Sequence, residues 1–261
     1  MNKTSSIIVL MTLRSLTCAA ALSAQTPTPP INSPTMQETK VFVGVNAGGQ
    51  TQSHTLNSDF SFPIYGQTAS VATTAAVDGG PIFDLNVGYR FGARPSVKHL
   101  ELPSLGVAVG FSSFSKKGSA SGAASIPSPI FFNRPASVTI DPIDAQRKDR
   151  SIYVVGVVFL PITDRIDLAA YGGPSVIRVQ QELIANVSVP AGTQTVDAVA
   201  LQNQSGTATG VNVGVDLAYL LAKNYGVGAF IRYNGGSVDL DTASDVKAGG
   251  LQLGVGVRLR F

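Results

Sequence analysis

The chain has 261 residues, of which only 13% are charged although 44% are hydrophobic, whereas soluble domains carry about 25% charged residues. No run of about 20 apolar residues follows the first thirty positions, which excludes a transmembrane helix there. The formal net charge is +3 and no basic block is present, so nucleic acid is not an expected partner. A weakly charged chain with 27 glycines indicates either a β-sandwich or a membrane β-barrel.

Residues 1–24 have the features of a secretory signal peptide: a positive charge at Lys3, an apolar run over residues 7–13 and small residues over 19–24. Cleavage is expected after Ala21, Ser23 or Ala24. It would leave 17 basic and 16 acidic residues and would remove the only cysteine, so no disulfide is expected.

Residues 25–39 predict an extended periplasmic linker, because positions 25–36 are rich in Pro and Thr and show no apolar period.

From residue 40 onward, the sequence alternates between apolar and small or polar side chains in eight segments, which is the period of a β-strand with two different faces. The clearest is the last, GLQLGVGVRLRF, with Leu, Val and Phe on one face and Gly, Gln and Arg on the other. The predicted strands are residues 40–50, 80–92, 104–116, 150–160, 165–180, 207–221, 225–239 and 248–261.

Two of the predicted strands are less regular. Residues 151–160 are apolar on both faces, and residues 165–180 change phase at Gly172-Gly173-Pro174, which predicts a β-bulge. Residues 183–202 predict a hairpin that carries two strands beyond the membrane. Residues 60–72 could form a similar hairpin or two further strands of a ten-stranded barrel, but a proline and poor alternation favour a loop.

The polar face of the predicted strands carries mainly Gly, Asn and Ser with a few Arg and Asp, not the Lys, Glu and Thr of a solvated sheet. Small residues suit the crowded interior of a narrow barrel whose apolar face meets lipid. An open strand edge in hydrocarbon would leave backbone groups unsatisfied. We therefore expect an all-β fold, a closed antiparallel transmembrane β-barrel of eight strands over residues 40–261.

The connections between these strands alternate in length. Short ones at 93–103, 161–164 and 222–224 are typical of periplasmic turns, and longer ones at 51–79, 117–149, 181–206 and 240–247 are typical of extracellular loops. An even strand number then places both termini in the periplasm, with the barrel in the cell outer membrane. An aromatic girdle facing lipid is expected at the periplasmic rim, formed by Tyr89, Phe91, Phe159, Tyr219, Tyr225 and Phe261.

The last strand, LQLGVGVRLRF, ends on an aromatic residue after apolar residues at alternate positions, and it resembles the signal read by the outer-membrane barrel assembly machinery. Residues 40–261 as a whole resemble the outer membrane protein β-barrel domain family, which includes small barrels such as the transmembrane domain of OmpA, OmpX and OmpW. The resemblance implies two partners: outer-membrane lipid, and the assembly machinery through the C-terminal strand with Phe261.

No catalytic motif, metal site or cofactor site is expected. His54 and His99 would lie at opposite ends of the barrel. His54, with Ser53 beside it and Asp59 nearby, is the one candidate for a hydrolase, but a solvated loop histidine is favoured.

Seven charged residues fall on the small-residue face and should point into the lumen: Asp84, Arg90, Asp167, Asp216, Arg232, Arg258 and Arg260. Charges inside a narrow barrel are costly unless they are paired, so we expect ion pairs, with Arg258 and Arg260 opposite acids such as Asp216 and Asp167. The alternative is an ion or solute path lined by these groups.

Two functions remain open at this stage, with a hydrolase a distant third. One is a structural or surface-interaction protein with a side-chain-filled interior, which displays residues 51–79, 117–149 and 181–206 to an unknown ligand. The other is a porin-like channel for small solutes.

Overall fold

The computed structural model describes residues 40–91, 96–97, 100–101, 103–240 and 243–261. The predicted signal peptide (1–24), the predicted linker (25–39) and His99 lie outside these residues. In the described part, no helix has the length and apolar character needed to cross a bilayer. The strands are β1 (Val41–Gln50), β2 (His54–Ile64), β3 (Gln67–Val77), β4 (Gly80–Phe91), β5 (Ser96–Val97), β6 (Leu100–Glu101), β7 (Ser104–Ile126), β8 (Ala136–Pro161), β9 (Ile166–Ser188), β10 (Ala198–Leu220), β11 (Tyr225–Leu240) and β12 (Ala243–Arg260).

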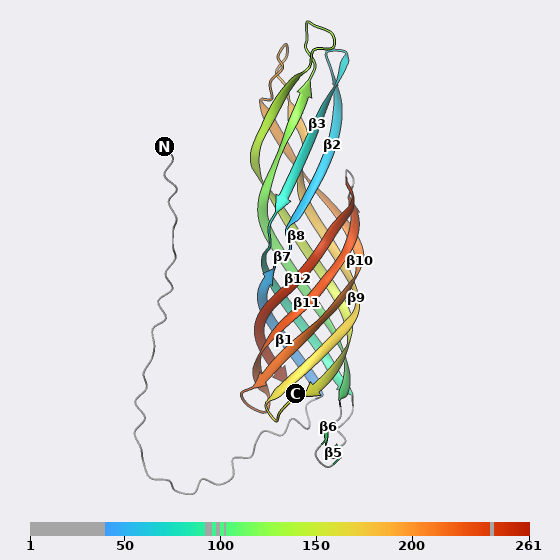
Figure 1. Cartoon of the computed structure of the whole chain (residues 1–261), viewed down its shortest axis with the longest axis vertical. Coiled ribbons are helices and arrows are strands. Elements are labelled where there is room, and N and C mark those ends of the chain that lie inside the picture. Colours follow the sequence, from blue (N-terminus) through green and yellow to red (C-terminus); the bar gives the residue numbers. More distant parts are fainter. Residues whose placement is uncertain (1–39, 92–95, 98–99, 102, 241–242) are drawn as a thin grey trace, which may run out of the picture. The chain divides into compact units, whose positions relative to one another are not determined.

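Eight of these strands form a closed ring (Figure 1). Hydrogen-bonded neighbours run in the order β7, β4, β1, β12, β11, β10, β9 and β8, and β8 pairs back with β7. Every pairing in the ring is antiparallel. The eight-stranded closed antiparallel barrel predicted from the alternation is therefore confirmed.

The hairpin β2–β3 does not add strands to the ring. β2 follows β1 after a break at residues 51–53, and β3 leads into β4 after a break at residues 78–79. β3 pairs with the second half of β7, from Ser70 opposite Ser125 to Ala76 opposite Ser119. The loop expected over residues 60–72 is thus wrong, and the hairpin alternative is correct. The expected loop at 117–149 is also wrong, because β7 and β8 continue through most of it.

These continuations make one end of the molecule longer than the other. We call the end with the connections at residues 162–165 and 221–224 the short-turn end. We call the opposite part the extension; it consists of β2, β3 and residues 113–126, 136–150, 177–188, 198–209, 235–240 and 243–249. In Figure 1 the extension is the upper part of the barrel, and the C-terminus lies at the short-turn end.

The two faces of the wall exchange polarity along the barrel axis. Between the short-turn end and the extension, the outward face is a belt of exposed Val, Leu and aromatic side chains. The inward face carries Gly, polar and charged residues, except on β8, where Val155, Val157 and Phe159 point inward. This is the arrangement of a wall that meets lipid outside. In the extension the interior is mainly apolar, with Ile126, Ile177 and Leu183 almost fully buried, and the exposed Lys117 and Arg178 lie outside. Buried polar groups such as Arg147 and Asp149 interrupt this apolar interior.

This exchange explains the apparent phase change in residues 165–180. The register between β8 and β9 stays constant from Ser175 opposite Tyr153 to Gly172 opposite Gly156, so the predicted bulge at 172–174 is wrong. The inward face of β9 simply becomes apolar where it enters the extension core. A register shift does occur higher up, opposite Ala200 and Leu201.

Five of the six predicted girdle aromatics are exposed on the outward face, but Phe159 is not. Phe159 points into the lumen and packs edge-on against Phe42, with ring centroids 5.3 Å apart. Because residues 151–160 are apolar on both faces, alternation alone could not tell which face meets lipid.

Candidate functional site

The lumen of the barrel holds the polar side chains that the sequence places on the small-residue face. Glycines on that face create the space for them. A Cβ at Gly110 would overlap the ring of Tyr153, and a Cβ at Gly228 or Gly256 would press on the guanidinium of Arg258. The small residues of the alternation therefore make room for large polar groups in a narrow barrel.

Nearest the short-turn end, Asp167 accepts hydrogen bonds from two arginines. Its Oδ2 atom lies 2.8 Å from Nη2 of Arg90 and 3.0 Å from Nη2 of Arg260. The guanidinium of Arg90 also lies over the ring of Phe159, 3.9 Å from its centroid. All of these side chains are buried, so the carboxylate charge is compensated within the lumen.

The next layer joins Arg258 on β12 to Asp216 on β10. Both oxygens of Asp216 accept hydrogen bonds from the guanidinium, through Nε at 2.9 Å and through Nη2. Nη1 of Arg258 donates to Oδ1 of Asn46 at 2.5 Å. A bidentate pair of this kind fixes the arginine in one orientation.

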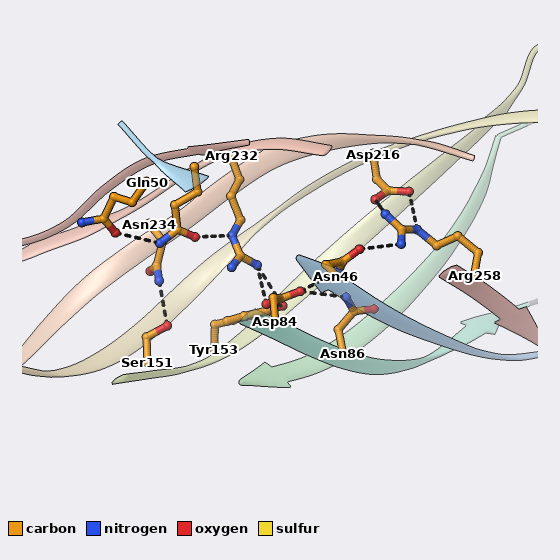
Figure 2. Close-up of polar contacts among 11 residues, drawn as sticks. Asn46, Gln50, Asp84, Asn86, Ser151, Tyr153, Asp216, Arg232, Asn234 and Arg258 are labelled. Carbon is orange, nitrogen blue, oxygen red and sulfur yellow. Dashed lines mark hydrogen bonds and ion pairs between the residues drawn. The ribbon is translucent and has the colours of Figure 1, made fainter. Parts of the chain in front are cut away.

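Asp84 is the centre of the third layer (Figure 2). It accepts hydrogen bonds of 2.7 Å from Arg232 Nη1, from the Tyr153 hydroxyl and from Asn46 Nδ2. A longer bond of 3.3 Å comes from Asn86 Nδ2. These donors come from β1, β4, β8 and β11, so the contacts cross the lumen.

A fourth layer continues toward the extension. Arg232 Nε donates to Gln252 at 2.7 Å, and Gln252 donates to Gln50 at 3.1 Å. Beyond it, buried Arg147 pairs with Asp149 at 3.0 Å and donates to the carbonyl of Lys247. All seven charged residues predicted to face the lumen therefore lie in it, within the first three layers.

Sequence reasoning missed three important polar residues of the barrel interior. Arg147 and Asp149 fall in the region that was expected to be a loop, where both faces are polar and no alternation marks the inward side. Tyr153 falls in the segment that is apolar on both faces. Gly110, which lies opposite Tyr153, leaves room for a buried ring. This signal can be used only when the register between β7 and β8 is known.

His54 lies in the extension near Arg147 and Asp149, not in a solvated loop. Its Nε2 atom is 3.1 Å from the amide nitrogen of Gln50. Burial, together with the charge of Arg147, lowers the pKa of His54 from 6.5 to about 4. Its expected hydrolase partners lie elsewhere: the hydroxyl of Ser53 donates to Asp78, and Asp59 is exposed.

Two cavities adjoin the layers. One of about 70 Å³ lies among the first three layers, lined by Asp84, Tyr153, Asp216, Arg258 and neighbouring residues. That space suits a few water molecules rather than a larger solute. The other, of about 590 Å³, lies between β2 and the start of β12 and is bordered by His54, Arg147 and Lys247. Among the described residues, no cluster of His, Cys, Asp and Glu could hold a metal ion.

Comparison with solved structures found similar bacterial proteins at low sequence identity. OprG from Pseudomonas aeruginosa is 10% identical, with a TM-score of 0.47 over 86% of this chain and 97% of that one. The attachment invasion locus protein Ail of Yersinia pestis, solved with a heparin analogue, is 16% identical, with a TM-score of 0.36 over 84% of this chain and 99% of that one. The protease OmpT of Escherichia coli is 10% identical, with a TM-score of 0.43 over 85% of this chain and 97% of that one.

A comparison with curated protein sequences found no significant match. The family model described as outer membrane protein beta-barrel domain matches residues 15–258, which is nearly the whole chain. With the closed ring, the apolar belt and this match in agreement, the chain belongs to the outer membrane protein β-barrel domain family.

Proposed function

We propose that this protein is a non-conducting outer-membrane barrel whose role is to hold its extension outside the cell for contact with an external partner. One observation carries the proposal: a buried ion pair between Arg232 and Asp84 crosses the lumen. It is backed by an apolar core inside the extension above it. A solute would have to break the ion pair and then separate that core.

The family and the lengths of the connections support one orientation of the barrel in the membrane. We place the short-turn end in the periplasm, together with both termini, after secretion by the predicted signal peptide. The extension then projects from the cell surface, because outer-membrane barrels carry short periplasmic turns and longer extracellular parts. Outer-membrane lipid would surround the belt, and the assembly machinery would bind the strand that ends at Phe261.

A channel for small solutes is the second candidate. The cavity of about 70 Å³ among the charged layers favours it, because charged linings are typical of selective pores. Its small volume and the cross-lumen contacts of Asp84 favour the closed barrel instead.

An enzymatic role is not proposed. OmpT is a protease, but the residues considered for a hydrolase in this chain make other contacts. The Ser53 hydroxyl donates to Asp78 at 3.2 Å, and the ring of His54 contacts Gln50.

Conductance of the purified barrel in planar lipid bilayers tests the proposal. We expect no stepwise conductance of porin size, while a wide porin added to the same membranes serves as the positive control. Steps of porin size that appear with each insertion of the wild-type protein would overturn the closed barrel in favour of the channel.

A further inference from the structure

Three connections meet at the far end of the extension. They are the β2–β3 turn at Tyr65 and Gly66, the β7–β8 connection at residues 127–135 and the β9–β10 connection at residues 189–197. We call this region the apex. Figure 1 shows it at the top of the barrel, at the opposite end from the C-terminus.

Hydrogen bonds join the three connections to one another. Gln67 donates to the carbonyl of Ser128 and accepts from the backbone of Asn133, both at 3.3 Å. Gln194 donates to the carbonyls of Ile126 at 2.9 Å and Arg134 at 3.0 Å. The β7–β8 connection is therefore held from both sides by side chains of its neighbours.

The β2–β3 turn is tied to the β9–β10 connection in the same way. The hydrogen of the Tyr65 hydroxyl is shared between the carbonyl oxygens of Pro190 and Thr193, at 3.1 and 2.9 Å, and the hydroxyl oxygen accepts a 3.1 Å hydrogen bond from the Thr193 N–H. The apex thus has a defined shape, and little conformational entropy would be lost when it binds.

This fixed scaffold presents three consecutive large apolar side chains to solvent. Ile130, Phe131 and Phe132 are 82%, 57% and 75% exposed. The hydroxyl of Ser128 accepts hydrogen bonds from the amides of Ile130 and Phe131, which fixes the turn that displays them. A contiguous exposed apolar patch on a rigid support marks an interaction site.

We infer that this apolar tip, Ile130–Phe131–Phe132, inserts into the lipid surface of a second membrane that comes close to the cell. The inference deepens the proposed function, on which it rests, by naming the partner of the extension. Apolar and aromatic side chains at a membrane-binding site enter the boundary between headgroups and acyl chains.

The size of the tip favours lipid over a protein partner. Three such side chains at these exposures present about 400 Å², whereas a stable protein interface needs about 800 Å² from each partner. The same shortfall argues against a second copy of this chain. A projecting tip needs no complementary pocket in lipid, and Arg134, whose guanidinium lies 5.4 Å from the Phe131 ring, is placed to meet a lipid phosphate.

The tip cannot reach the membrane that holds the barrel. On β7 the lipid-facing belt ends at Phe111, and the strand continues to Ile126 before the connection begins. That distance is about 15 residues at about 3.3 Å each, or roughly 35–40 Å of height for a tilted strand. The bilayer in question is therefore a separate one.

The chain contains no tryptophan, so Phe131→Trp introduces a single fluorescent reporter into the tip. The full barrel carrying this change, held in lipid nanodiscs, would be mixed with separate vesicles of phosphatidylcholine and phosphatidylglycerol. We expect a blue shift of the emission, quenching when the vesicles contain brominated lipid, and co-flotation of nanodiscs with vesicles. Emission whose wavelength and intensity do not change when the vesicles are added would overturn the inference.

Matched variants assign the binding to the tip. In the Phe131→Trp background, Ile130→Ser with Phe132→Ser should lower co-flotation at least tenfold. Leu201→Ser, which alters an exposed apolar residue on β10, should leave it unchanged. Equal loss in both variants, or nanodiscs that pair through their tips without vesicles, would contradict lipid binding.

The conductance of the purified barrel is measured separately from vesicle binding. A barrel that does not conduct and does not bind vesicles would refute only the lipid partner. Porin-sized conductance steps would refute the proposed function.

Discussion

Arg232 and Asp84 meet across the lumen: Nη1 of the arginine lies 2.7 Å from Oδ2 of the aspartate, although β12 and β1 separate their strands in the ring. Both side chains are almost completely buried, at 2% and 1% exposure. The closed ring brings the two side chains together, because it places their strands on facing sides of the lumen. Removing one partner leaves the other charge uncompensated.

Replacing Arg232 with Ala should therefore lower the free energy of unfolding by about 3–5 kcal/mol, because Asp84 would stay buried without its cation. Urea unfolding of the barrel in lipid vesicles measures the change. Arg178→Ala, on the exposed outward face of β9, is the matched control and should unfold as the wild type does. Equal stability of both variants would show that the pair does not support the barrel.

Replacing Arg258 with Ala should be less damaging than replacing Arg232. Its partner Asp216 is 19% exposed and borders the lumen cavity, so water can solvate the carboxylate once the arginine is gone. We expect a loss of about 1–3 kcal/mol. The same unfolding assay compares the two variants. A larger loss of unfolding free energy for Arg258→Ala would contradict the argument that Asp84 is more fully buried than Asp216.

The folded barrel should resist detergent until it is boiled. A closed ring in which β8 pairs with β7 has no free edge in the membrane-spanning part from which unfolding can start. On a detergent gel, unboiled and boiled samples should therefore run at two different apparent sizes. Identical mobility would show that the closed ring does not persist in detergent.

Deletion of Phe261 should lower the yield of barrel in the outer membrane and raise its degradation in the periplasm. Phe261 exchanges two backbone hydrogen bonds with Val41, of 3.0 and 2.8 Å, at the seam between the first and last strands. It is also the last residue of the predicted assembly signal. Quantitative blotting of outer-membrane fractions measures the effect.

Phe91→Ala provides the control for that deletion. Phe91 is also exposed and aromatic, and it lies at the short-turn end of β4. If Phe261 acted only as one member of the aromatic girdle, the two changes would reduce the yield equally. We expect Phe91→Ala to assemble at nearly the wild-type level.

Acid should destabilise the protein partly through His54. Its pKa is about 4 in the folded state against 6.5 in the unfolded chain, so between these values the unfolded chain binds a proton that the folded chain does not. Stability should therefore fall as the pH drops from above 6.5 to about 4, and this contribution should then level off. After allowance for solvent near the ring, we expect a loss on the order of 2 kcal/mol.

His54→Gln separates this effect from the titration of other groups. A glutamine can still bond to Gln50 but carries no charge at low pH, although Arg147 and Asp149 remain nearby. The difference between the unfolding free energies at pH 7.5 and pH 4.5 should be smaller in the variant. An unchanged difference would show that His54 does not contribute to the acid sensitivity.

The alternation of side chains was enough to predict the eight membrane-crossing strands, since a strand between lipid and a narrow lumen must alternate apolar with small or polar residues. In residues 250–261 the pattern is unbroken, and β12 runs through them as far as Arg260. Counting residues from the strand ends also places Arg258 and Asp216 at similar depths. The number of strands between these two residues depends on the order of the strands in the ring, and in this barrel that order is the order along the chain.

Only the tertiary structure decided the features of segments that do not lie between lipid and a polar lumen. In the extension water replaces lipid outside, so the apolar face turns inward, and Ile177 and Val179 produce a phase change without a bulge. The strand of Phe159 is apolar on both faces, so its own sequence does not determine which face points inward. The pairing with neighbouring strands places Phe159 in the lumen, where it packs against Phe42. Arg147 and Asp149 are paired inside a wall whose local sequence is polar on both faces. A periodic pattern specifies that two faces differ, whereas the surroundings of each face determine which one points inward.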